Sequence, residues 1–214
     1  MAIGIKSLSI TVLLLTLYGN IFSQVGVKLS ESDRLSFEQK IIEQSQKIES
    51  LQCDFIQEKT SSLILEKSAT QGVMLYQAPS KLRWEYTKPT PSTLIINGNS
   101  AVLLDKNGQK SGDEKILKQL GSIIISMING SGITQNKQFS TDYYEFDNSL
   151  ILVVLTPIQK RLKDFYEKIE MKIDPKTKLA NEIVLFEKTG DTMSIILTNK
   201  ILNTEISQNK FETQ

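Results

Sequence analysis

The six residues Lys81–Tyr86, which read KLRWEY, decide the fold class. Large apolar side chains (Leu82, Trp84 and Tyr86) alternate with charged ones along this stretch. Successive side chains of a β-strand point to opposite faces of the sheet, so this period of two predicts a strand with one face buried. Half-buried strands are typical of antiparallel sheets. We therefore expect an antiparallel sheet with Leu82, Trp84 and Tyr86 on its apolar face.

The sequence on both sides of this stretch predicts further strands joined by short turns. Asn97-Gly98 is a typical hairpin dipeptide, and groups rich in Asp, Asn, Gly and Pro mark several later turns. Consecutive strands of this kind close into a barrel or curve into a half-barrel. We expect one mainly β domain over residues 24–214, with strands near residues 54–60, 70–76, 92–96, 101–104, 143–146, 150–155, 165–173, 182–187 and 192–200.

Two amphipathic helices interrupt the strands. The first is expected to begin near Ser30, where small hydroxyl residues and acids suit a helix N-terminus, and to continue to about Ser50. The second, over residues 114–128, carries a wide apolar stripe at positions one turn apart. We expect these helices to cover the open side of the sheet as a lid. The lid residues of the second helix are Ile116, Leu117, Leu120, Ile123, Ile124 and Met127.

The composition excludes several classes of chemistry. The chain has 25 Lys and Arg residues against 24 Asp and Glu, one Cys and no His. The lack of His excludes Ser-His-Asp and Cys-His catalysis and His-ligated zinc, and a single Cys excludes an internal disulfide. A balanced charge argues against nucleic-acid binding. We expect no enzyme activity, catalytic residue, cofactor or metal site, and we expect Cys53 to be a buried apolar residue.

Residues 1–23 have the pattern of a secretory signal peptide. Lys6 provides a basic start, a mainly apolar run covers residues 8–22, and Ser23 is a small residue at which cleavage could occur. The apolar run is shorter than the roughly 20 residues that span a membrane, and a single-pass anchor is the alternative. We expect an exported, soluble protein.

Four motifs resemble the outer-membrane lipoprotein carrier protein LolA family. They fall in the family's order and spacing, followed by a closing Phe-bearing segment at residues 209–211. The motifs are LQCDFIQ at residues 51–57, QGVMLY at 71–76, PSKLRWEY at 79–86 with Pro89 after it, and LIING at 94–98.

The resemblance implies an unclosed, strongly curved antiparallel half-barrel with a helical lid. It also implies a periplasmic, monomeric chaperone that receives acylated lipoproteins from an inner-membrane ABC-type transporter and passes them to an outer-membrane acceptor. Several family members have an arginine before the first Pro, where it holds the lid closed. Here that position is Ala78, and Arg83 is expected to face away from Trp84.

From the pattern alone, the apolar face of the sheet packs against the helices and nothing else. The resemblance adds a cavity in which the lid helices and acyl chains compete for one apolar face. The residues expected to line it are Leu82, Trp84 and Tyr86, with Phe55, Leu75 and Ile95 as further candidates. Three alternatives remain open: a carrier of another amphiphile such as a glycolipid or aryl-polyene intermediate, a periplasmic lipoprotein-sensing regulator, and a lipid hydrolase.

Overall fold

The computed structural model describes residues 26–63, 67–128, 130–134, 137–146 and 150–212, so the expected signal peptide lies outside it. Within this part of the chain, twelve strands form one sheet in which every neighbouring pair is antiparallel. The strands are β1 (Val27–Lys28), β2 (Ser50–Thr60), β3 (Lys67–Gln77), β4 (Lys81–Lys88), β5 (Ser92–Asn97), β6 (Ser100–Leu104), β7 (Lys110–Ser111), β8 (Phe139–Phe146), β9 (Leu150–Pro157), β10 (Tyr166–Ile173), β11 (Ala180–Glu187) and β12 (Thr192–Leu202).

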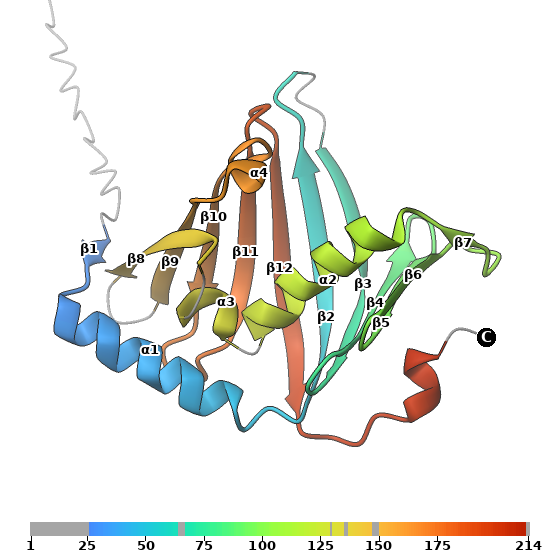
Figure 1. The fold of residues 1–214 in the computed structure, drawn as a ribbon, viewed down its shortest axis with the longest axis horizontal. Coiled ribbons are helices and arrows are strands. Elements are labelled where there is room, and N and C mark those ends of the chain that lie inside the picture. Colours follow the sequence, from blue (N-terminus) through green and yellow to red (C-terminus); the bar gives the residue numbers. More distant parts are fainter. Residues whose placement is uncertain (1–25, 64–66, 129, 135–136, 147–149, 213–214) are drawn as a thin grey trace, which may run out of the picture.

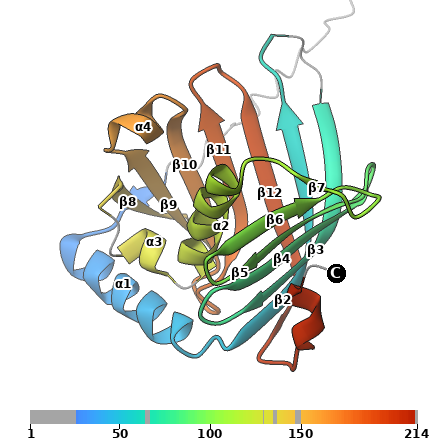
Figure 2. The same cartoon turned by 45° about the vertical axis from the view of Figure 1, so that its right-hand side comes forward.

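The sheet is curved and does not close. Its order is β1-β8-β9-β10-β11-β12-β2-β3-β4-β5-β6-β7, so the two-residue strands β1 and β7 stand at opposite edges. Figure 2 shows the sheet curving around α2 (Glu114–Ile128). The predicted fold class, a mainly β, unclosed antiparallel half-barrel with helices over its open side, is confirmed.

The α-helices lie on one side and at both ends of the strands, whereas the 3₁₀ helix lies on the other side. Figure 1 shows α2 crossing in front of the central strands and α1 (Glu31–Ser45) along the end at which β2 begins. The short helix α3 (Ser131–Thr134) contacts both of them, and α4 (Lys160–Lys163) connects β9 to β10. The 3₁₀ helix η1 (Gln208–Phe211) packs on β4 and β5.

The two long helices begin where the sequence predicted. The Ser30 hydroxyl accepts a hydrogen bond from the backbone N–H of Asp33 at 3.2 Å, which caps α1. α1 ends at Ser45, earlier than expected, because the chain turns there and Ile48 packs among the first residues of β2. α2 covers residues 114–128, as expected, and Gly130 follows it with a positive φ of 73°.

Two apolar clusters make up the core. The first joins β2 to β6 and includes Cys53, Phe55, Met74, Leu82 and Trp84. The second joins β8 to β10 with α1 and includes Phe37, Ile41, Tyr143, Val153 and Met171. The cavity described below lies between these clusters, because residues packed against each of them line it.

Candidate functional site

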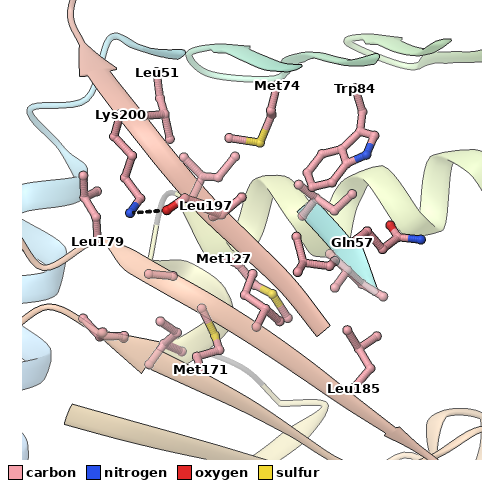
Figure 3. A pocket seen from close by; sticks show the side chains of 18 of the residues that line it. Leu51, Gln57, Met74, Trp84, Met127, Met171, Leu179, Leu185, Leu197 and Lys200 are labelled. Carbon is pink, nitrogen blue, oxygen red and sulfur yellow. Dashed lines mark hydrogen bonds between the residues drawn. The ribbon is translucent and has the colours of Figure 1, made fainter. Parts of the chain in front are cut away.

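A cavity of about 310 Å³ lies between the sheet and the helices α1 and α2. This volume is at the lower end of the range for small-molecule sites, roughly 300–1,000 Å³. Its wall comes from strands β2 to β6 on one side and β10 to β12 on the other, which the curvature of the sheet brings opposite each other. Apolar side chains dominate it, as Figure 3 shows for Leu51, Met74, Met127, Met171 and Leu185.

An aromatic group forms one part of this wall. The rings of Phe55 and Trp84 lie 4.3 Å apart at an angle of 31°, and Tyr86 meets Phe55 edge-on at 5.3 Å. The Tyr86 hydroxyl donates to Oε1 of Gln57 at 3.1 Å, and burial raises the pKa of Tyr86. Nε1 of Trp84 is buried and makes no hydrogen bond of normal geometry within the described residues. This part of the wall is therefore mainly apolar, with the Tyr86–Gln57 hydrogen bond at its polar edge.

Gly72 makes room for this aromatic group. A Cβ at this position would meet the carbonyl of Glu85 on β4 and would lie 2.7 Å from Cζ of Phe55. Gly72 pairs with Phe55 on one side and Tyr86 on the other, so all three share one face of the sheet. The missing side chain leaves room for the Phe55 ring to pack against Trp84.

The predicted site residues of β4 lie where the pattern placed them, on the face that α2 covers. Trp84 and Tyr86 line the cavity itself. Leu82 and Phe55 are fully buried in the first apolar cluster beside them, so they support the wall and do not line the space.

Leu75 and Ile95 need correction, because the register places them on the other face of the sheet. Both pair with Arg83, which alternates with Trp84 and so points away from the cavity. Ile95 is buried on that face, where η1 packs on β5. The cavity side of these strands is instead provided by Met74 and Leu94.

Four of the predicted lid residues line the cavity: Leu117, Ile123, Ile124 and Met127. The side chains of Ile116 and Leu120 lie outside the part of the chain that the structure describes. The contact between helix and sheet is close, since a Cβ on Gly121 would collide with the side chain of Ile96. α2 therefore packs directly on β5 and β6 and leaves the cavity beside this contact.

Sequence reasoning missed the half of the wall that comes from β10 to β12. Met171 and Ile173 alternate with charged residues on β10, and Ile183, Leu185 and Ile195 continue the same face. The alternation of apolar and charged residues on β10 could have predicted that one face of this strand is buried. It did not identify the wall because a sequence does not show that β10 curves round to face β4.

Polar groups gather at two places on the cavity wall. Glu187 lies 3.6 Å from the Lys59 ammonium, which also pairs with Asp191 at 3.7 Å. Lys178 and Lys200 are elsewhere on the wall, and burial lowers the pKa of each. Burial also raises the pKa of Cys53 to about 12, and the side chain is 1% exposed, which fits the predicted role of a buried apolar residue.

Neither Ala78 nor Arg83 is among the described residues that line the cavity. Ala78 is exposed in the β3–β4 turn. The Arg83 guanidinium pairs with Glu85 at 2.7 Å and donates to the backbone carbonyl of Lys210 at 3.2 Å. Arg83 therefore holds the C-terminal segment, whose Phe211 is 1% exposed, against the convex face of the sheet.

The family follows from this architecture and from a direct match. Residues 46–214 match the family model "Outer membrane lipoprotein carrier protein LolA". The chain belongs to the LolA family. No curated protein matches the chain.

Solved structures share the fold at low sequence identity. An uncharacterized conserved protein of Thermus thermophilus is 9% identical, with a TM-score of 0.51 over 83% of this chain and 92% of that one. MucB in the Pseudomonas aeruginosa MucA/MucB complex is 10% identical, with a TM-score of 0.51 over 85% and 61%. The Mycobacterium tuberculosis lipoprotein LppX is 9% identical, with a TM-score of 0.46 over 83% and 100%. At these identities the likeness concerns the fold alone.

Proposed function

We propose that this LolA-family chain is a periplasmic carrier that binds acyl chains in the cavity under α2 and moves acylated cargo from the inner to the outer membrane. The observation that carries the proposal is an apolar cavity whose cover is a separate helix rather than part of the sheet. Lipoproteins are the cargo that the family's description names. The proposal includes no catalytic step.

The energetics suit a carrier. Burying an acyl chain contributes about 0.8 kcal/mol per methylene, so a chain of ~15 methylenes gains roughly 12 kcal/mol relative to water. This is ample for carrying a lipid anchor through water, and it makes unaided release slow. The proposal therefore includes two partners by family resemblance: an inner-membrane ABC-type transporter that loads the carrier and an outer-membrane acceptor that unloads it.

The cover can exchange with cargo because both are apolar. Leu117, Ile124 and Met127 face the cavity from α2 and protect it from water when no cargo is bound. An acyl chain that takes their place keeps the same wall dry. Within the described residues, no helix is both long and apolar enough to cross a membrane.

A matched pair of leucine substitutions tests the proposal. Leu103 lines the cavity, whereas Leu75 is on the opposite face of the sheet and is similarly half-buried. Isothermal titration calorimetry with an acylated peptide should show Leu103→Asn binding about tenfold more weakly than the unmodified protein, because an amide then replaces apolar wall. Leu75→Asn should bind normally.

The same peptide without its acyl chain is the control ligand. It should not bind detectably to either variant or to the unmodified protein. Equal binding of the acylated and unacylated peptides, or equal weakening by both substitutions, would overturn the proposal.

A further inference from the structure

Two lysines stand on an otherwise apolar wall and come from different segments. Lys178 belongs to the turn between β10 and β11, and Lys200 lies near the end of β12, so both are at the end of the strands where α1 crosses. Both lysines line the same cavity, and Asp174, on the turn that carries Lys178, acts on both ammonium groups. Figure 3 shows Lys200 among the lining side chains beside Leu179.

Neither ammonium is neutralised by an ion pair within the described chain. Lys200 donates to neutral oxygens, Oδ1 of Asn181 at 2.7 Å and the carbonyl of Leu197 at 3.0 Å. The Asp174 carboxylate accepts the backbone N–H groups of Lys176 and Thr177 at 2.7 and 3.1 Å, so it is held by its own turn. Lys40 lies close enough to Lys178 to repel it. Lys176 also acts on Asp174, so this one carboxylate is shared among several lysines.

The other charged part of the wall differs, because Glu187 there has an ion-pair partner in Lys59 at 3.6 Å, which also pairs with Asp191 at 3.7 Å. A cavity that removes charged groups from water usually pairs them. The unpaired lysines at one end therefore identify a place where a bound molecule supplies the negative charge.

We infer that the cargo is an anionic amphiphile, with its carboxylate or phosphate between Lys178 and Lys200 and its acyl chain along the apolar wall toward Trp84. This inference rests on the proposed function and narrows its substrate class. Two ammonium groups on separate segments can each donate to one anion, and charge-assisted hydrogen bonds are the stronger kind. A neutral acyl alcohol would leave both ammonium groups without such a partner.

Matched ligands with and without charge test this inference. Palmitate and hexadecanol share a chain length and differ in the head group, and monopalmitoyl phosphatidic acid and monopalmitoylglycerol form a second pair that separates phosphate from carboxylate. Binding to the purified protein is followed by Trp84 emission. At least one anionic ligand should bind about tenfold or more tightly than its neutral partner. Equal affinities within both pairs would overturn the inference.

Substitutions of the lysines locate the anion. Methionine keeps the apolar stem and removes the charge. The Lys178 ammonium makes no side-chain hydrogen bond within the described chain and lies over the Phe37 ring, 5.4 Å from its centre. Lys178→Met, and the double variant with Lys200→Met, should weaken binding of the anionic ligand and leave binding of its neutral partner unchanged. The control is Lys188→Met, an exposed lysine outside the cavity wall, which should change neither ligand.

Three results remain distinguishable. Selective loss of the anionic ligand in the variants supports the inference. If both ligand types bind and the variants bind them as tightly as the unmodified protein does, the inference is overturned but the proposed function is retained. In that case the lysine stems line the wall while their ammonium groups remain in water. If none of the four amphiphiles binds the unmodified protein, both the inference and the proposed function fail. Thermal unfolding of each variant checks that the fold is retained.

Discussion

At the residue scale, the cavity depends on how Gly72, Phe55 and Trp84 fit together. Phe55 and Trp84 are both buried, and their rings lie 4.3 Å apart. Gly72 provides the space that this stacking needs between β2 and β4. The shape of the wall is therefore set by a missing side chain as much as by the aromatic ones.

We predict that Gly72→Ala destabilises the protein by about 1–3 kcal/mol, because the added methyl group meets the Glu85 carbonyl and the Phe55 ring. Denaturant unfolding followed by Trp84 emission measures the change. Ser68→Ala, an exposed position on the same strand, is the control and should lie within about 0.5 kcal/mol of the unmodified protein. A Gly72→Ala variant as stable as this control would contradict the packing described here.

The single cysteine gives a second prediction at this scale. Burial raises the pKa of Cys53 to about 12, so at pH 8 about one thiol in ten thousand is the reactive thiolate. We expect the folded protein not to react with a chromogenic disulfide reagent over an hour, and one equivalent to react once denaturant is added. Complete reaction of the folded protein within minutes would show that the first apolar cluster opens readily.

Face assignments show what the sequence could and could not reveal about single residues. On β4 one set of alternating residues is charged, so the inward positions of Trp84 and Tyr86 were predictable. On β5 the residues Leu94, Ile95 and Ile96 are all apolar and all buried, because α2 covers one face and η1 the other. A strand that is covered on both faces is apolar at every position, so its sequence does not show which residues face the cavity. Ile95 was assigned to the wrong face for this reason.

At the element scale, α2 is the cover of the cavity. Its apolar stripe packs on β5 and β6 through the contact between Gly121 and Ile96, and Leu117 is buried in the first apolar cluster. Ser122 is exposed on the opposite side of the helix. The helix can therefore be disturbed from its solvent side without changing any residue that faces the cavity.

We predict that Ser122→Pro opens the cover. Proline inside a helix removes one backbone hydrogen bond and clashes with the preceding turn, at a cost of about 3 kcal/mol. The cavity wall then becomes accessible, so fluorescence of the dye ANS should rise several-fold, while the far-ultraviolet circular dichroism of the sheet is retained. Ser122→Ala is the matched control and should leave dye binding unchanged. No increase with proline would show that α2 is not what excludes water from the cavity.

The positions of the two long helices were predicted better than those of the two-residue strands and four-residue helices. α2 has a wide apolar stripe over fifteen residues, and Ser30 caps α1, so both helices have signals that a sequence displays. β1 and β7 have two residues each, and α3 and α4 have four. Segments of that length have no measurable period, and their conformation is set by the sheet edges and loops around them.

At the scale of the whole molecule, curvature creates the site. β4 and β11 are separated by β12, β2 and β3 in the sheet order, yet residues of both line one cavity. The sequence predicted the number and direction of most strands and, with the family resemblance, the half-barrel. It could not show which strands face each other across the hollow, because this depends on the accumulated twist and bending of the sheet.

In the proposed carrier, an acyl chain occupies the cavity beside Trp84, the chain's one tryptophan. The most direct measurement is a titration with a dibromostearoylated peptide, because bromine quenches tryptophan emission only at close range. We expect saturable quenching at one peptide per protein, reversed by excess unbrominated stearoylated peptide. Bound peptide that leaves Trp84 emission unquenched, or quenching that the unbrominated competitor does not reverse, would contradict it.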